Sequence, residues 1–283
     1  MLDSILIKAP AKLNLFLRII GKTNNGYHNI RTGITFLDLH DEVNISLSDI
    51  NNLSYSGPFK PSSSIYENDI IVKVLNNASI KKQLKVKIKI TKNIPWKAGL
   101  GSASTDAASL IKGLQKLGLI NDMDNQFLSK IGADIPICYY GQDCIATGIG
   151  DKVNKDIDFP KYYFVLVHPK IQLSTSEMYS KIKKYLKFDE DHIEQISYLK
   201  TFHEDDNGND FEKIIRKENI EIVDLLNFLS NLENSIFSRM SGSGSCCYAV
   251  FENKENAKKA FDIISKKYSN YWIYLAENNA INN

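Results

Sequence analysis

The sequence predicts an α+β protein built from two domains, and three observations support that prediction. Apolar residues alternate with polar ones in several segments, which is the period of a strand with one buried face. Other segments repeat apolar residues at three- and four-residue spacing, the period of a helix with one buried face. The chain has 283 residues, 43% of them hydrophobic, so it can bury the cores of about two globular domains.

Strands dominate the start of the chain. Alternation predicts strands over residues 12–20, 30–37 and 43–47, followed by a polar, Pro-containing loop over residues 56–64. Asn68 or Asp69 is expected to cap a helix whose apolar face includes Ile70, Ile71 and Val74. Residues 84–90, in which apolar residues alternate with lysines, form the clearest strand of the chain.

A glycine-containing loop joins that strand to a helix over residues 107–117, which Gly118 ends. A shorter helix is expected over residues 125–131 and a glycine turn over residues 148–150. Residues 156–160 read as a junction, so we predict one domain over residues 1–155 and a second over residues 156–283.

The second half is predicted to pack helices on an antiparallel sheet. Strands are expected over residues 162–167, 246–251 and 271–275, and helices over residues 176–186, 222–232 and 256–267. An acidic stretch, residues 203–210, is expected to be a surface loop, and the polar tail, residues 277–283, is expected to fray.

Charge and cysteine usage exclude several classes of protein. The 35 Lys and Arg residues nearly balance the 33 Asp and Glu residues, which argues against a general polyanion binder, so nucleic acid is not expected as a partner. The four cysteines form no CxxC pair and the five histidines no HExxH motif, so reduced core thiols are expected and a protein-built metal centre is not. No apolar run approaches about 18 residues, so we expect a cytoplasmic protein with no membrane partner.

The glycine loop at residues 95–106 (PWKAGLGSASTD) is a candidate phosphate site. The free N–H groups of a first helical turn attract anions, and Gly99 and Gly101 would let the backbone approach a ligand closely. The pattern is not the GxxxxGK[ST] of a Walker-type P-loop. The alternative is an ordinary turn capped by Ser104 or Thr105, and Asp106 is expected to cap the helix rather than contact phosphate.

Further segments lie in a fixed order along the chain: residues 10–16 (PAKLNLF), 26–28 (GYH), the glycine loop, 132–136 (GADIP), 148–150 (GIG), 209–212 (NDFE) and 241–244 (SGSG). Together they resemble the signature regions of the GHMP family of small-molecule kinases, and most closely its branch that acts on a cytidyl diphosphate substrate. The resemblance extends over nearly the whole chain. It implies the two-domain GHMP-kinase architecture, with an active cleft between the domains.

The resemblance also assigns roles to residues. It implies Asp134 as the proton acceptor and Lys12 as the cation beside that carboxylate and the γ-phosphate. Because Pro136 disfavours helical geometry at Ile135, Asp134 is expected at a chain bend. The implied ATP-binding residues are Pro95, Lys97, Ala98, Gly99, Leu100, Gly101, Ser102, Ala103, Ser104 and Thr105. The implied substrate-binding residues are Asn14, Tyr27, His28, Thr175, Tyr179, Gly242, Ser243 and Gly244.

ATP with Mg²⁺ is the implied co-substrate; the metal ligands are unknown, with Ser104 the best guess. The family loop usually reads PxGAGLGGGSSDAA, whereas Lys97, Ser102 and Ala103 stand here where glycines are expected. These side chains narrow access to the loop backbone or rigidify it.

Five of the assigned residues also have a structural alternative: a solvated lysine for Lys12, a helix-end carboxylate for Asp134, a core or helix-face side chain for Tyr27 and Tyr179, and a strand-end amide for Asn14. The function that the resemblance implies is transfer of phosphate from ATP to a small cytidyl diphosphate molecule. The protein is expected to be a monomer or weak homodimer. The alternatives are another GHMP-type small-molecule kinase and a non-catalytic nucleotide- or RNA-binding protein.

Overall fold

The computed structural model describes residues 3–62, 69–77, 85–157, 159–183, 185 and 208–278. The chain forms two compact units that are interleaved in sequence. Unit 1 comprises Met1–Lys12, Leu39–Trp96 and Gly101–Gly141, and unit 2 comprises Leu13–Asp38, Lys97–Leu100 and Gln142–Asn283. The compact units therefore do not follow a single cut near residue 155, and the predicted domain boundary there stays a prediction.

Unit 1 contains the strand that the alternation of residues 84–90 predicts. Strand β4 (Val86–Thr91) buries Val86, Ile88 and Ile90 and exposes the lysines between them. It pairs in parallel with β3 (Asn52–Ser56) and antiparallel with residues 42–47 of β2 (His28–Leu47). Strand β1 (Ser4–Lys22) also pairs with β2. The prediction is thus confirmed over residues 86–90, whereas Lys85 precedes the strand and residue 84 lies outside the described residues.

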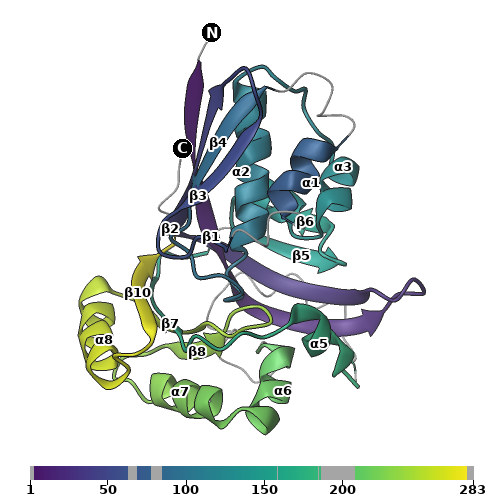
Figure 1. Ribbon diagram of the computed structural model, residues 1–283. Coiled ribbons are helices and arrows are strands. Elements are labelled where there is room, and N and C mark those ends of the chain that lie inside the picture. Colours follow the sequence, from purple (N-terminus) through teal and green to yellow (C-terminus); the bar gives the residue numbers. More distant parts are fainter. Residues whose placement is uncertain are drawn as a thin grey trace. The chain divides into compact units, whose positions relative to one another are not determined.

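The described part of unit 1 contains four helices: α1 (Ile70–Asn76), α2 (Ser102–Lys116), α3 (Asn125–Ile131) and α4 (Ile135–Tyr140). Asp69 caps α1 by accepting a hydrogen bond from the Ile71 amide at 2.9 Å. Asp69 is one of the two residues predicted to cap this helix. Helix α2 buries one apolar face, α1 and α4 pack on α2, and α3 contacts α1 and α4. Figure 1 shows α1 between α2 and α3.

Unit 2 contains the predicted antiparallel sheet, in the order β10-β7-β9-β8. Its strands are β7 (Tyr163–His168), β8 (Phe237–Met240), β9 (Cys247–Phe251) and β10 (Trp272–Glu277), and every pair is antiparallel. Helices α7 (Ile220–Ser230) and α8 (Lys254–Lys267) pack on these strands (Figure 1). A shared apolar core includes Val165, Leu225, Leu229, Ala249, Phe251 and Ile264.

The remaining strands of unit 2 build on the long strand β2. Residues 30–34 of β2 pair with β5 (Cys144–Gly148), which pairs in turn with β6 (Lys152–Asn154). The turn that joins β5 to β6 contains the predicted glycine turn at residues 148–150, where Gly150 N–H donates to the Thr147 carbonyl at 3.1 Å. Two short helices, α5 (Thr175–Ser180) and α6 (Asp210–Glu218), complete the unit.

The secondary structure differs from the predictions in several places. Residues 30–37 and 43–47 form one strand, β2, because the polar residues between them are held inside the strand by hydrogen bonds. Strands β3, β5, β6 and β8 and helices α4 and α6 were not predicted. Asp210, placed in a surface loop by its acidic surroundings, begins α6. Helix α5 ends at Ser180, well before residue 186, which lies outside the described residues together with most of residues 203–210 and 277–283.

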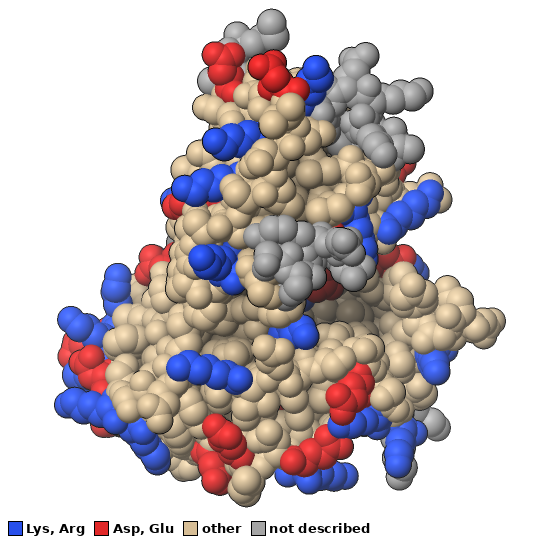
Figure 2. Space-filling view, in the orientation of Figure 1, with Lys and Arg blue, Asp and Glu red and all other residues tan. Residues whose placement is uncertain are grey.

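The four cysteines are buried and free, as predicted. Burial raises the pKa of Cys246 to about 12, so its thiol stays protonated at neutral pH. Among the described residues, no helix is long and apolar enough to cross a membrane. Over α7 and α8 of unit 2, the surface carries Lys and Arg interspersed with Asp and Glu (Figure 2).

Candidate active site

Lys12 and Asp134, which are 122 positions apart in sequence, form an ion pair in unit 1. The Lys12 Nζ lies 2.7 Å from Asp134 Oδ2. The lysine side chain is only 8% exposed, whereas the aspartate side chain is 39% exposed. A buried cation therefore holds a carboxylate that solvent and a ligand can still reach. The solvated lysine considered as an alternative for Lys12 is not what the structure contains.

Asp134 occupies the N-cap position of α4, but within the described residues its side chain makes no capping hydrogen bond. Its carboxylate contacts Lys12 instead. The bend predicted from Pro136 was wrong in one respect, because Ile135 begins a helix. Proline fits the first turn of a helix, where its missing N–H would have had no intrahelical partner.

The glycine loop leads into α2 at Gly101, which is the N-cap of that helix and has no side chain to cap it. Gly101 adopts φ +68°, and a Cβ there would lie 3.0 Å from the Cβ of Lys12. The apolar stem of Lys12 therefore packs against the start of α2. Uncapped amides at the N-terminus of a 15-residue helix, next to a lysine, form a favourable environment for a phosphate.

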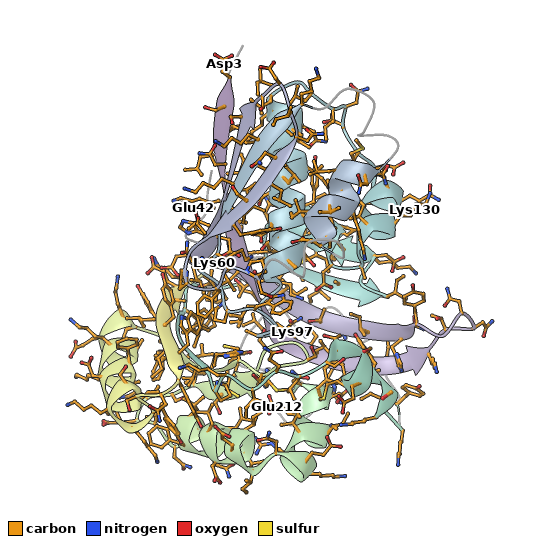
Figure 3. All side chains as sticks on the ribbon, viewed as in Figure 1. Asp3, Glu42, Lys60, Lys97, Lys130 and Glu212 are labelled. Carbon is orange, nitrogen blue, oxygen red and sulfur yellow. The ribbon has the colours of Figure 1, made fainter. Side chains whose placement is uncertain are left out.

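The three departures from the family loop have different local settings. Lys97 adopts φ +54°, a conformation that favours glycine, and its side chain is exposed (Figure 3). Ser102 and Ala103 lie in the first turn of α2, where a Cβ causes no backbone strain. Ser102 Oγ donates to Asp41 Oδ2 at 2.9 Å, which supports the expectation that the substituted side chains rigidify the loop.

A buried charge cluster in unit 1 joins both ends of the glycine loop. The Lys92 ammonium contacts the carboxylates of Asp41 and Asp106, and it donates to Ser102 Oγ at 2.5 Å. Asp41 Oδ1 also accepts from the Ile94 amide at 2.8 Å. Asp106 therefore pairs with Lys92, and the prediction that Asp106 caps the helix was wrong.

Sequence reasoning missed this cluster, although a signal was present. Lys92 follows Ile88 and Ile90 on the buried side of β4, and Asp41 interrupts the buried side of β2 in the same way. The register that pairs Glu42 with Thr91 brings Asp41 opposite Lys92 one position further along. Two opposite charges at buried positions of paired strands predict an ion pair.

Burial and the opposite charges have opposing effects on the pKa values in this cluster. Burial raises the pKa of Asp106 well above its ordinary value, although the Lys92 charge acts in the opposite direction. Burial lowers the pKa of Lys92, but the charges of Asp106 and Asp41 outweigh that effect and raise it above its ordinary value. Lys92 therefore stays charged, and its ammonium holds the carboxylates on either side of the loop.

In unit 2, the loop Ser241–Gly244 lies against Gly99 of the glycine loop. Ser241 Oγ donates to the Gly99 carbonyl at 2.9 Å and accepts from the backbone N–H of Asn14 at 3.2 Å. Gly99 adopts φ +76°, and a Cβ there would clash with the carbonyl oxygen of Ser241. Glycine is therefore required at position 99 by the backbone packed against it.

Asn14 presents a buried oxygen to the Ser241–Gly244 loop. Its Nδ2 donates to Thr32 Oγ1 at 2.8 Å, and Thr32 Oγ1 donates to the Phe16 carbonyl at 2.6 Å, which fixes the orientation of the amide. Asn14 Oδ1 is buried and has no partner among the described residues. An unpaired buried acceptor is costly, by about 1–3 kcal/mol, so this atom is suited to accept a hydrogen bond from a ligand.

Unit 2 also brings together the aromatic residues predicted to bind substrate. The rings of His28 and Tyr179 are stacked with centroids 4.8 Å apart, and Phe211 packs edge-on against Tyr179. Tyr27 is 57% exposed beside His28. Burial, and then the nearby Lys22 charge, lower the pKa of His28 below its ordinary value, which favours the neutral ring.

The other predicted substrate residues lie at the start of α5 and in the Ser241–Gly244 loop. The hydroxyls of Thr175 and Ser243 share a hydrogen bond of 2.7 Å. Unit 1 thus brings together Lys12, Asp134 and Gly101, and unit 2 brings together Asn14, Gly99 and the loop, and separately the aromatic residues.

The described residues contain no group of three or more His, Cys, Asp and Glu side chains that could hold a metal ion. This finding does not bear on a metal that arrives with a nucleotide, since Mg²⁺ in such sites is held largely by phosphate oxygens and water.

Comparisons with known proteins show the family of this chain. The GHMP kinases N terminal domain model matches residues 69–151, and the GHMP kinases C terminal model matches residues 178–270. The 4-diphosphocytidyl-2-C-methyl-D-erythritol kinase of Pelagibacter ubique (strain HTCC1062) is 33% identical over 281 residues, covering 96% of this chain and 98% of the relative. The enzyme of the same name from Wolbachia pipientis wMel is 34% identical over 289 residues, covering 96% and 98%.

Solved structures share the fold. A crystal structure of 4-(cytidine 5'-diphospho)-2C-methyl-D-erythritol kinase matches with a TM-score of 0.79 and 22% identity, covering 98% of this chain and 100% of that one. A homoserine kinase from Cytophaga hutchinsonii ATCC 33406 matches with a TM-score of 0.70 and 18% identity, covering 99% and 95%. With relatives above 30% identity along nearly its whole length, the chain belongs to the GHMP kinase family.

Proposed function

We propose that the protein transfers the γ-phosphate of ATP to the 2-hydroxyl of 4-diphosphocytidyl-2-C-methyl-D-erythritol, a step of the non-mevalonate route to isoprenoid precursors. The observation that supports the chemistry most strongly is the ion pair of Lys12 with a half-exposed Asp134 beside the N-terminus of α2. The full-length relatives bear the name of that kinase. The interdomain cleft implied by the family stays a prediction.

Phosphoryl transfer requires an aimed hydroxyl, a proton acceptor and positive charge on the transferring group. Asp134 is the proposed proton acceptor, because its carboxylate is accessible and is not used to cap α4. Lys12 holds that carboxylate in place from a buried position and offsets the charge that develops on the phosphoryl oxygens.

The glycine loop, residues 95–105, is the proposed ATP site, with the uncapped amides of α2 directed at phosphate. Mg²⁺ would reach the site with ATP and screen its phosphate charge. Ser104, half-buried in the first turn of α2, is the proposed protein ligand of that ion.

The cytidyl group is proposed to bind at Tyr27, His28 and Tyr179, where an aromatic face can stack on the base. Asn14 Oδ1 and the loop hydroxyl of Ser243 would bind polar groups of the substrate, with Thr175 supporting that hydroxyl. We further propose that the protein is cytoplasmic, acts as a monomer or weak homodimer and has no nucleic-acid partner.

A substrate panel in a coupled ADP-release assay tests the function. With MgATP, the cytidyl substrate is expected to yield ADP in proportion to the substrate added, whereas mevalonate, galactose and homoserine yield almost none. The opposite ranking would favour another GHMP-type kinase. If no compound yields ADP while RNA binds with salt-sensitive affinity, the proposal fails in favour of a non-catalytic binder.

Replacing Tyr27 by alanine is expected to raise KM for the cytidyl substrate about tenfold and to leave KM for ATP unchanged. The reason is the loss of a base-stacking face worth roughly 1–3 kcal/mol on an exposed side chain that supports little of the core. Steady-state kinetics with each substrate varied in turn measures both values. Tyr274→Ala on β10 is the control, and equal rises in both KM values would show that Tyr27 only supports packing.

A further inference from the structure

Asn209 lies behind the Ser241–Gly244 loop in unit 2. Its side-chain nitrogen donates to the Met240 carbonyl and to the Gly242 carbonyl, each at 2.7 Å. These two carbonyls flank Ser241, the residue that contacts both Gly99 and Asn14. Asn209 is buried, so both hydrogen bonds are shielded from water.

Neighbouring residues of the same segment support this attachment. Glu212, in the first turn of α6 (Figure 3), accepts a hydrogen bond from the Met240 amide at 2.7 Å. Asp210 Oδ2 accepts from the Ile19 amide on β1 at 2.8 Å. The segment 209–212 thus joins the base of the loop to the strand that carries Asn14.

The side chain of Asn209 has a second task, which is distinct from the first. Its Oδ1 accepts from the Phe211 amide at 2.9 Å and so caps α6. The cap uses the oxygen, whereas the contacts to the loop use the nitrogen. A side chain that supplies only an oxygen would therefore keep the cap and lose the loop.

We propose that Asn209 is a positioning residue for the nucleotide, which acts by setting the Ser241–Gly244 loop against Gly99. This inference rests on the proposed function, because the proposed function assigns Gly99 to the ATP site. Without the two donated hydrogen bonds, the loop carbonyls no longer have fixed partners. The Ser241 hydroxyl then loses its register with the Gly99 carbonyl, and the glycine loop must be ordered at the expense of nucleotide affinity.

The test compares Asn209→Asp and Asn209→Ser with Asn219→Asp and Asn219→Ser. Asn219 caps α7 through its side-chain oxygen, which accepts from the Ile222 amide at 3.0 Å, so it matches Asn209 as a cap. KM for ATP is expected to rise about tenfold in both Asn209 variants, the factor that one ordinary net hydrogen bond represents. It is expected to stay unchanged in both Asn219 variants, with similar changes of Tm in the two pairs.

A KM for ATP that is the same in the Asn209 and Asn219 variants would overturn the proposal. A fall in kcat at unchanged KM would also overturn it, because partial unfolding removes active enzyme without changing KM. If the Asn209 variants do not fold, Ser241→Ala tests the same link, with the same expected rise and the same contrary result. In the double variant Asn209→Ser with Ser241→Ala, the rise is expected to be no larger than in the worse single variant.

The two proposals fail differently. Wild-type protein that releases no ADP with the cytidyl substrate contradicts the proposed function. Calorimetric titration with MgATP alone would still compare the Asn209 and Asn219 variants, and equal affinities there would contradict the role of Asn209 itself.

Discussion

Asp134→Asn is expected to lower kcat roughly 10²–10⁴-fold while the protein stays folded, as removal of a general base predicts. The amide is nearly the same size as the carboxylate, and its oxygen can still accept a hydrogen bond from Lys12 Nζ. The amide oxygen is nevertheless too weak a base to take the proton of an alcohol. KM for ATP should change little, because ATP binding is assigned to the glycine loop.

Asp124→Asn is the matched control for this variant. Asp124 is also an aspartate at the start of a short helix of unit 1, but it is exposed and its side chain caps α3, accepting from the Phe127 amide at 2.7 Å. The kcat of Asp124→Asn is expected to equal that of the wild type. Turnover of Asp134→Asn within a few-fold of the wild type, measured by ADP release, would remove Asp134 from the chemistry.

Lys12→Met is expected to lower kcat on the order of 10²–10³-fold, the usual effect of losing one donor that stabilises transition-state charge. Methionine keeps an unbranched apolar stem to pack on Gly101 and loses only the ammonium. KM for ATP is expected to rise less than kcat falls, because the developing charge on the phosphoryl group is greatest in the transition state. Single-turnover measurement at saturating ATP isolates this step.

The exposed Lys130 at the end of α3 provides the control, since Lys130→Met removes one positive charge from the same unit (Figure 3). If Lys12→Met turns over as fast as the wild type, the Lys12–Asp134 ion pair has only a structural role. If both catalytic proposals hold, Lys12→Met combined with Asp134→Asn should lose less activity than the product of the two single losses, because the residues act as a unit.

Much of the fold could be predicted because local patterns and tertiary packing agree. Residues 86–90 alternate strictly, and helix α3 has the predicted bounds, residues 125–131. The antiparallel sheet of unit 2 likewise follows from strands separated by helical segments. In these segments a single buried face decides the structure, so the sequence alone was sufficient.

The failures occurred where long-range contacts overrode a local signal. Polar residues near Asp41 suggested a break in β2, yet Asp41 is tied to Lys92 and to the amide of Ile94, 53 positions away. Asp210 lay in an apparent acidic loop, but its carboxylate is held by β1, 191 positions earlier. The spacing of apolar residues does not identify partners that are distant in sequence. Those partners are identified only when the pairing of the strands is known.

The candidate site divides in the same way. The roles of Lys12 and Asp134 came from family resemblance, and the distance between them came from the fold. The resemblance also pointed to residues 209–212 as a landmark without a role. The structure was needed to show that the Asn209 side chain donates hydrogen bonds to the loop through its nitrogen and caps α6 through its oxygen.

Phosphorus NMR of the reaction mixture tests the central claim most directly, because it observes the transferred group itself. With MgATP and the cytidyl substrate, the wild-type protein should form one new phosphomonoester for each ADP, and Asp134→Asn should form both at least a hundredfold more slowly. ADP that accumulates with inorganic phosphate and no new phosphomonoester, or an Asp134→Asn variant as fast as the wild type, would contradict the account.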